Sequence, residues 1–410
     1  MGIAQQAAKI VGEEAPTKWA DIEEKMFIPY NTDADIIPEY AQMNGSVQIK
    51  QGDVVLINYP LEFRLNESQA LHDLDFYARA QSPDGPAMTW AMFAIGALDL
   101  SPRGCASYTY FIYASQPYLR APFYQFSEQI VDNIYANGDT NPAFTFLTGH
   151  GGLLQVPTHG FTGYRPRIDA FYLDPSIPPQ LQDGIIVKGM KHHSASFDVH
   201  VSPHNTTITR RHSKKSGDNK AVTVRIGSQN EKPGDYPLLP GDTLVIPTRR
   251  PDLNGTDIPG NKAECKAAES TSPYVPGQFP LGAVDGSNQT QWRSSTPNPS
   301  ELIVDLGDLT DINALSMNWA QWPPIKWSVF ASNSTGDKKH WTEVYSADHI
   351  KLSEPWVEKD ALKVVMRIGN TTSIALDDDQ KTSARFVRLV IEGDREGAGN
   401  GGTVAQFAIL

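Results

Sequence analysis

Apolar residues recur at helical spacing through the first 150 residues or so. Asn66 and Gln69 have the spacing of a helix-capping pair, and apolar residues follow them at intervals of three or four. Residues 86–100 (PAMTWAMFAIGALDL) are apolar on nearly every side, with Pro86 suited to a first helical turn. The pattern predicts a buried helix there, ended by Ser101-Pro102.

Two more helices are predicted in this region. Residues 105–119 are rich in apolar and aromatic side chains, and Pro117 limits the run. Phe126, Ile130 and Ile134 indicate a further helix that stops at residues 137–138 (Asn-Gly). Successive buried helices suit either an α/α barrel or a compact bundle, and the pattern leaves both open.

The periodicity changes to strand-like alternation after residue 170. Gly, Pro, Asn and Asp separate the alternating segments, so they predict an antiparallel β-domain, a sandwich, over 169–250. The polar stretch 251–270 is predicted to be a linker. Residues 271–410 predict a second β-sandwich, with strands in segments 301–307, 312–319, 326–332, 361–368 and 384–393.

Composition excludes two classes of partner. The net charge is -12 and the isoelectric point is about 5.3, which argues against binding to nucleic acid, because that requires a basic surface. No apolar stretch approaches the roughly 20 residues that cross a bilayer. The basic residues between 210 and 215 lie among Ser, Gly, Asp and Asn, which is typical of a solvated loop.

Glycosylation signals indicate a chain made through the secretory route, for the cell wall, periplasm, vacuole or medium. Residues 1–19 contain no apolar signal-peptide core, so we expect the natural N-terminus to lie upstream. The two cysteines, Cys105 and Cys265, do not settle the compartment. Seven Asn-X-Ser/Thr sequons occur, at Asn44, Asn66, Asn205, Asn254, Asn288, Asn333 and Asn370.

A few polar residues beside apolar runs are candidates for chemistry. Lys50-Gln51 offers a charged donor and an amide suited to sugar hydroxyls. The simpler interpretation is that Lys50 is an ordinary lysine at the end of a helix. Glu128 lies among aromatic residues, where desolvation raises the pKa of a carboxyl group and suits it to proton transfer. The alternative for Glu128 is a surface ion pair. Asp84 precedes the buried helix, and its alternative is an ordinary turn residue.

Other patterns are better explained by structural roles than by chemistry. Residues 147–152 (LTGHGG) lack a phosphate-loop pattern and read as a tight turn in which His150 is a satisfied polar residue. The histidines 192, 193, 200 and 204 have no Cys or acidic partners, and neighbouring strand residues point to opposite faces, so we predict no metal there. Most tryptophans after residue 290 are expected in the core, with one or two available to stack on sugars.

Several stretches resemble glycoside hydrolase family 65, in its fungal acid trehalase branch. Residues 50–63 (KQGDVVLINYPLEF) resemble the family's KQADVVLL signature, and residues 85–95 and 144–167 resemble its hydrolase members. The combination of 126–133 (FSEQIVDN) with 141–152 (NPAFTFLTGHGG) looks specifically like the acid trehalases. Residues 271–410 resemble a discoidin-like (coagulation factor 5/8 type C) domain, through 283–295 and 384–393.

The resemblance implies an (α/α)6 barrel that hydrolyses α,α-trehalose or a related α-glucoside with inversion. It implies that Lys50 and Gln51 hold glucose and that Glu128 is the base, with Asp84 as second candidate. The family's acid is a glutamate in a DPDE-like motif before the Lys-Gln pair, and no such motif occurs here. We therefore expect a truncated form: part of the barrel in 1–168, exposing apolar faces, and only half of the catalytic pair.

Three further expectations follow from the resemblance. No cofactor is implied, although Asp285 and Thr290 match positions that hold structural calcium in some discoidin-like domains; the usual glutamate partner is replaced by Gln406. A second hypothesis is a glycan-binding fragment, with a cell-wall glycan as partner, in which only the tail is functional. A third, a phosphorylase, lacks the Ser-rich phosphate signature near residues 80–90.

Overall fold

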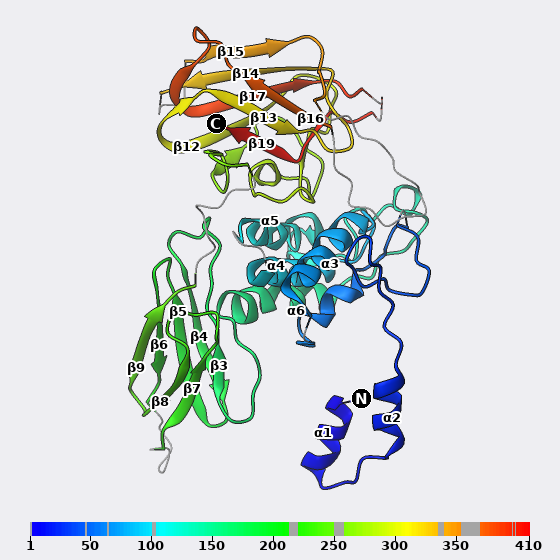
Figure 1. Ribbon diagram of the computed structural model, residues 1–410, viewed down its shortest axis with the longest axis vertical. Coiled ribbons are helices and arrows are strands. Elements are labelled where there is room, and N and C mark those ends of the chain that lie inside the picture. The colour runs from blue at the N-terminus through cyan, green and yellow to red at the C-terminus, as the bar shows by residue number, and fades with distance from the viewer. Residues whose placement is uncertain are drawn as a thin grey trace.

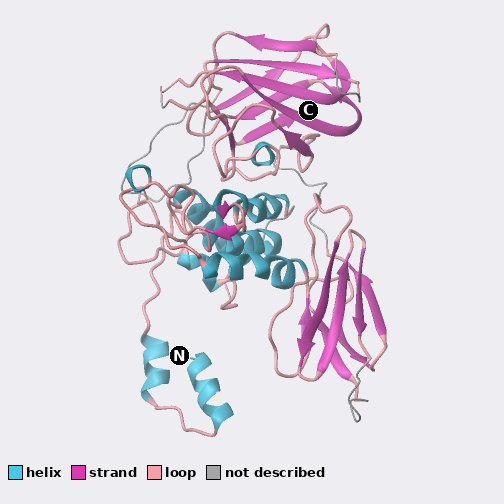
Figure 2. Cartoon of the chain, turned by 180° about the vertical axis from the view of Figure 1, so that it is seen from behind, coloured by secondary structure: helices cyan, strands magenta, loops and turns pink. Residues whose placement is uncertain are grey.

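We describe a computed structural model of the chain. It describes residues 2–45, 47–63, 65–100, 104–212, 220–249, 258–334, 340–353, 370–395, 397 and 399–410. Helices occupy the first part of the chain and strands the rest, as the sequence predicts. Figures 1 and 2 show a central helical domain with one β-domain beside it and another above it.

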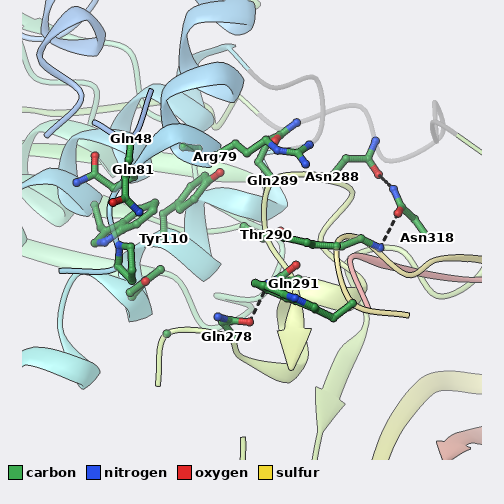
Figure 3. A pocket seen from close by; sticks show the side chains of 18 residues that line it. Gln48, Arg79, Gln81, Tyr110, Gln278, Asn288, Gln289, Thr290, Gln291 and Asn318 are labelled. Atoms are coloured by element: carbon green, nitrogen blue, oxygen red, sulfur yellow. Dashed lines mark hydrogen bonds between the residues drawn. The ribbon is translucent and has the colours of Figure 1, made fainter. Parts of the chain in front are cut away.

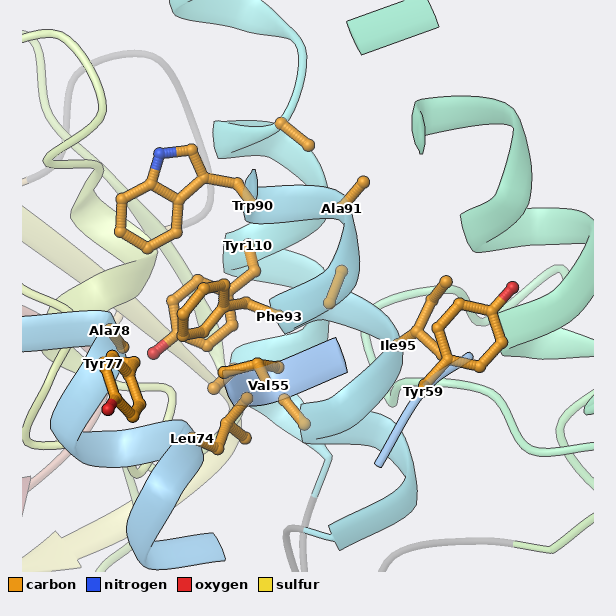
Figure 4. Close-up of a cluster of buried hydrophobic side chains, with 14 of the residues drawn as sticks. Val55, Tyr59, Leu74, Tyr77, Ala78, Trp90, Ala91, Phe93, Ile95 and Tyr110 are labelled. Atoms are coloured by element: carbon orange, nitrogen blue, oxygen red, sulfur yellow. The ribbon is translucent and has the colours of Figure 1, made fainter. Parts of the chain in front are cut away.

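The helical domain is built around α4, the apolar helix expected after Pro86. Nine of its residues are buried, and it contacts α3, α5 and α6. Val55, Leu74, Phe93 and Tyr110 meet in its core (Figure 4). The helices are α1 (Gly2–Val11), α2 (Lys18–Lys25), α3 (Glu67–Ala80), α4 (Thr89–Leu100), α5 (Cys105–Tyr113) and α6 (Leu147–Gln155), with short helices η1 (Asp53–Ile57), η2 (Gln116–Tyr118), η3 (Ile134–Ala136) and η4 (Val156–Phe161).

Asn66 caps α3 as its spacing predicts, because its side-chain oxygen accepts a hydrogen bond from the Ser68 N–H. Two other local predictions are wrong. The helix expected over residues 126–134 is absent: β1 (Leu119–Arg120) pairs there with β2 (Gln125–Phe126), and hydrogen bonds tie the segment to its neighbours. The glycine-rich turn expected at 147–152 is the helix α6.

Glycines let α6 lie directly on α4. A Cβ at Gly149 would stand 2.8 Å from Phe126 and 3.2 Å from Ala87, and one at Gly152 would stand 3.3 Å from Ala91. Close helix packing therefore overrides the low intrinsic helix propensity of glycine. The outer face of the same region is apolar and open, with Phe144, Leu147 and Leu154 all more than half exposed.

The middle β-domain is a two-sheet sandwich. Residues from both sheets fill one core, in which Phe171 stacks on Phe197 with ring centroids 4.4 Å apart. One correction applies: β3 and β7 pair in parallel, so the domain is not wholly antiparallel. Its sheets are β3-β7-β8 and β4-β5-β6-β9, from β3 (Phe171–Leu173), β4 (Ile185–His192), β5 (Ala195–Val201), β6 (Asn205–Arg210), β7 (Val222–Ile226), β8 (Gly234–Leu238) and β9 (Thr243–Pro247).

The C-terminal β-domain has a five-stranded and a three-stranded sheet that share a core. The predicted strand at 361–368 lies outside the described residues. The strands are β10 (Ala267–Glu269), β11 (Trp292–Arg293), β12 (Ser300–Ile312), β13 (Ala314–Asn318), β14 (Lys326–Ser332), β15 (Thr342–Ala347), β16 (Thr371–Ala375), β17 (Thr382–Glu392), β18 (Thr403–Val404) and β19 (Gln406–Ile409), with η5 (Pro280–Ala283) between β10 and β11.

The expected linker is partly incorrect. Within 251–270, Ala263 is fully buried in the C-terminal core and β10 pairs with β12, so the domain begins before residue 271. Residues 251–257 lie outside the described chain. The local pattern does not indicate this, because β10 has only three residues and the segment around it is polar.

A disulfide between Cys105 and Cys265 joins the start of α5 to the C-terminal domain. The aromatic rings of Tyr113 and Phe279 meet across the same junction, with centroids 6.2 Å apart. Asp99 on α4 makes the corresponding link to the middle domain through Arg249 at 3.3 Å, and it also pairs with Arg165 at 2.8 Å. Both β-domains are thus attached to the helical domain through side chains.

Candidate active site

The loop carrying Lys50 and Gln51 is held by Gln81, at the end of α3. The Gln81 amide nitrogen donates to the Lys50 carbonyl, and its oxygen accepts from the Gly52 N–H at 3.1 Å. Gly52 itself packs where a Cβ would lie 3.1 Å from Tyr77 and 3.2 Å from Phe93. The backbone of the loop is therefore fixed against the helical core.

Glu128 is fixed by backbone hydrogen bonds on both sides. Its carbonyl accepts from the Ala87 N–H at 2.8 Å, and its N–H donates to the Ala143 carbonyl at 3.0 Å. The Ala143 N–H in turn donates to Oε2 of the Glu128 carboxylate at 2.9 Å, leaving Oε1 on the other side. The side chain is 21% exposed, so the carboxylate is reachable but mostly enclosed.

Lys50 and Glu128 come together although they are far apart in the sequence. The Lys50 ammonium Nζ lies 3.9 Å from Glu128 Oε1, and the lysine side chain is 71% exposed. Because the lysine is exposed and the two charged atoms are 3.9 Å apart, the pair adds little to stability. It places a cation and a carboxylate side by side at the edge of the helical domain, which is an arrangement that suits binding and activation of polar groups.

Gln51 faces a cavity of about 190 Å³ between the Lys50 loop, α4 and α6. Its amide nitrogen donates to Asp53 Oδ1 at 3.1 Å, which fixes the side chain at the cavity wall. Thr148 and Gln155 of α6 line the other side. The cavity offers hydroxyl and amide groups and is open to solvent beside the candidate site.

Asp84 lies in a turn, which matches the ordinary turn role that the sequence offers as the alternative to catalysis. The Asp84 N–H donates to Ser82 Oγ at 3.2 Å, and the Asp84 carbonyl accepts from the Gln129 amide at 2.9 Å. These bonds tie the Asp84 turn to the segment that carries Glu128. Among the described residues, the Asp84 carboxylate makes no hydrogen bond or ion pair with Lys50 or Glu128.

The histidines take structural positions. His150 on α6 shares a hydrogen bond with the Phe146 carbonyl at 2.9 Å, as expected for a satisfied polar residue. The sequence predicts that His192 and His193 point to opposite faces of a strand, and this is wrong. β4 ends at His192, and the two rings meet with centroids 4.3 Å apart. Within the described ranges, no group of three or more His, Cys, Asp or Glu is placed to hold a metal.

The calcium candidates form a buried cluster of oxygen atoms beside α5. Thr290 Oγ1 donates to the Asp285 carboxylate at 2.7 Å, and the Ser287 N–H donates to it at 3.0 Å. Burial raises the pKa of Asp285 to about 7, with a smaller contribution from the negative charge of Glu264. The oxygens are of the type calcium prefers, but a cation would compete with the hydrogen bonds that already satisfy Asp285.

The surface residues agree in part with expectation. Trp292, Trp319 and Trp327 are buried, whereas Trp322 and Trp341 are half-buried; Trp356 lies outside the described residues.

Most of the described glycosylation sequons are accessible. The asparagines at 66, 205, 288 and 333 are exposed and Asn44 is half-buried, and Asn254 is not described. Asn370 is buried, with its amide donating to the Ala320 carbonyl at 2.7 Å, so that sequon is a structural residue rather than an accessible acceptor.

Curated relatives match nearly the whole chain. A cell wall acid trehalase from Arthroderma benhamiae is 34% identical over 448 residues, and the alignment covers 99% of this chain and 42% of the relative. An acid trehalase from Emericella nidulans is 34% identical over 442 residues, covering 99% and 41%. This chain is a homologue of the fungal acid trehalases. It spans about two-fifths of the length of these two relatives.

Three other comparisons cover part of this acid trehalase homologue. A protein-glucosylgalactosylhydroxylysine glucosidase from Danio rerio is 27% identical over 66% of this chain and 37% of its own length. The F5/8 type C domain family matches residues 266–406, which agrees with a C-terminal domain that begins before residue 271. A chitosan-binding module from Paenibacillus sp. IK-5 is 23% identical over 36% of this chain and 96% of its own, with a TM-score of 0.29.

Sequence reasoning missed Gln81 and the disulfide. Gln81 carries no sequence signal, because its role depends on bringing the end of α3 beside the Lys50 loop. The disulfide had one: two cysteines in a chain with many sequons.

Proposed function

We propose that the chain contributes half of an inverting α,α-trehalase-type active site. Lys50 and Gln51 bind glucose, and Glu128 is the base that activates water. The observation that supports this is the convergence of Lys50 and Glu128 at 3.9 Å, in a homologue of the acid trehalases. We further propose that the general acid is not among these 410 residues, which contain no DPDE-like motif before Lys50.

Inverting hydrolysis requires a water molecule on the face of the sugar opposite the leaving group. The Ala143 N–H holds one Glu128 oxygen, so the other oxygen, which faces Lys50, is available to accept a proton from water. The water oxygen then forms a bond to the anomeric carbon while the glycosidic bond breaks. A separate acid, about 6.5–9.5 Å from the base in such enzymes, protonates the departing oxygen.

The remaining parts of this proposal concern context. We propose that the helical domain is part of an (α/α)6 barrel, whose other helices pack on the exposed apolar residues of α6. We propose a location outside the cytosol, because relatives are named as cell wall or periplasmic/secreted acid trehalases. Among the described residues, every helix is too short or too polar to cross a bilayer. Calcium at Asp285 stays a prediction, and hydrolysis itself is proposed to use no cofactor.

A substrate with a leaving group that departs without protonation tests the base separately from the acid. We expect the purified chain to hydrolyse α-D-glucosyl fluoride: the C–O bond forms to water, the C–F bond breaks, and the water proton passes to Glu128. We expect no hydrolysis of trehalose near pH 5. Glu128→Gln should lower the rate of glucosyl fluoride hydrolysis about 10²–10⁴-fold. The control Glu231→Gln changes an exposed glutamate in the middle domain and should leave that rate unchanged.

Two results would contradict the proposal. Fluoride hydrolysis that persists in Glu128→Gln would remove Glu128 as the base. Trehalose hydrolysis by the chain, lost on substitution of Glu128, would show that a complete catalytic pair is present. Circular dichroism of each variant would establish that its helical domain is folded.

A further inference from the structure

A second cavity, of about 380 Å³, lies between the helical domain and the C-terminal domain (Figure 3). Its helical wall comes from the segment before Lys50, the end of α3, and α5. Its other wall comes from residues 277–291 and 318–322 of the C-terminal domain. Its volume falls in the range of about 300–1,000 Å³ that is typical of small-molecule sites.

Side-chain amides dominate this cavity, and both walls supply them. Gln291 donates to Gln278 at 2.8 Å, and Asn318 donates to Asn288 at 3.0 Å. The Asn318 oxygen also accepts from the Ala320 N–H at 2.9 Å. An amide has two N–H donors and an oxygen with two lone pairs, so each of these four amides keeps both donor and acceptor capacity. The amides in the lining include Gln48, Gln81, Gln278, Asn288, Gln291 and Asn318.

One lining amide has a buried atom that the protein does not satisfy. The side-chain oxygen of Gln289 is buried and has no hydrogen-bond partner among the described residues. A buried acceptor without a donor costs roughly 1–3 kcal/mol. Because this oxygen is enclosed, a ligand hydroxyl would reach it only after the Gln289 side chain turns toward the cavity.

Aromatic rings complete the lining. Tyr113 stacks on Trp90 with centroids 4.2 Å apart, and Gly277 packs so closely on Tyr113 that a Cβ there would lie 2.4 Å from the ring. Trp322, half-buried, lines the opposite wall, where the Arg293 guanidinium lies 3.7 Å from its ring centroid. The apolar face of a sugar ring packs on such surfaces, while its hydroxyls meet the amides.

Charge narrows the class of ligand. Among the described lining residues, Arg79 is the one charged side chain, and it has interactions within the protein. The described part of the wall contains no carboxylate to bind a cation and no cluster of basic side chains to bind a phosphate or an acidic polymer. A neutral molecule rich in hydroxyl groups matches the lining best.

We propose that this interdomain cavity binds a neutral saccharide of one or two hexose rings, at a site separate from Lys50 and Glu128. It requires both domains, so it differs from a binding site on the C-terminal domain alone. The Cys105–Cys265 disulfide holds the two walls together. Two sources share this chemistry: a free sugar, and an N-glycan on the exposed Asn288 at the cavity's rim.

The test uses the full chain produced in a bacterial periplasm, where disulfides form and the chain carries no N-glycan. Calorimetric titration with trehalose, laminaribiose and diacetylchitobiose should show saturable binding of at least one. Gln48→Ala on the helical wall and Asn288→Ala on the other should each weaken it about five- to tenfold. Gln229→Ala, at an exposed site in the middle domain, is the matched control.

The outcomes separate this site from the active site. Binding that survives Glu128→Gln but weakens in both wall variants supports the cavity, whether or not hydrolysis is ever observed. Absence of binding by all three sugars, or binding that the wall variants leave unchanged, overturns the proposal. Protein from a fungal host distinguishes the two sources. If Asn288 carries a glycan, and added sugars bind only after that glycan is removed, the occupant is the chain's own glycan. If Asn288 is unmodified and added sugars bind, the occupant is a free sugar.

Discussion

The packing of α6 against β2 and Ala87 makes a sharp prediction, because two glycines on α6 differ in what surrounds them. A Cβ at Gly149 would lie 2.8 Å from Phe126 and 3.2 Å from Ala87, whereas a Cβ at Gly151 would meet nothing within 4 Å. Both lie inside the helix and have negative φ angles. Replacement by alanine therefore changes the same local propensity at both positions and the packing at only one.

The magnitudes follow from these two effects. Alanine in place of glycine within a helix stabilises by about 0.5–1 kcal/mol, which we expect for Gly151→Ala. At Gly149 the same gain opposes an overpacking cost of about 1–3 kcal/mol, because Phe126 is buried and has little room to move. Gly149→Ala should therefore be less stable than Gly151→Ala by about 1–3 kcal/mol.

Thermal unfolding followed by circular dichroism at 222 nm measures the helical domain with little contribution from the strands. For a domain of this size about 1 kcal/mol corresponds to a change in Tm of roughly 2–4 °C. We expect Gly151→Ala to raise the Tm slightly and Gly149→Ala to lower it by several degrees relative to Gly151→Ala. Equal Tm values for the two variants would refute the close packing of Gly149 on Phe126 and Ala87.

Two other predictions concern buried charge and the domain junction. Asp73 on α3 is buried, and this burial raises the pKa of its carboxyl group to about 7. The folded state therefore binds the Asp73 proton more tightly than the unfolded state does. The stability that this adds is fully present below about pH 4 and is lost as the pH rises to 7. Asp73→Asn should flatten that part of the pH dependence in urea unfolding, and an unchanged slope would contradict the burial. Cys105→Ser combined with Cys265→Ser should leave both β-domains folded but increase hydrogen exchange at α5 and η5, with a loss of up to about 2–5 kcal/mol. Unaltered exchange there would show that the disulfide does not hold the junction.

Local sequence patterns determined the elements whose environment is uniform along their length. Residues 86–100 are apolar on every side, so they form a buried helix in almost any fold, and α4 results. Alternation with β-branched residues likewise identified β5, β6, β12 and β17, because each has one face in a core. The resemblance to known motifs made Lys50 and Glu128 candidate site residues, but it gave no distance between them.

Only the tertiary structure decided the elements whose local preference is weak or misleading. The glycines of residues 147–152 disfavour a helix by themselves, yet they allow α6 to approach α4 more closely than larger residues would. The helical spacing at 126–134 is overridden by hydrogen bonds that pair this segment with 119–120 and 143–144. The interdomain cavity, the role of Gln81 and the 3.9 Å pair of Lys50 and Glu128 all depend on long-range contacts, which no local pattern encodes.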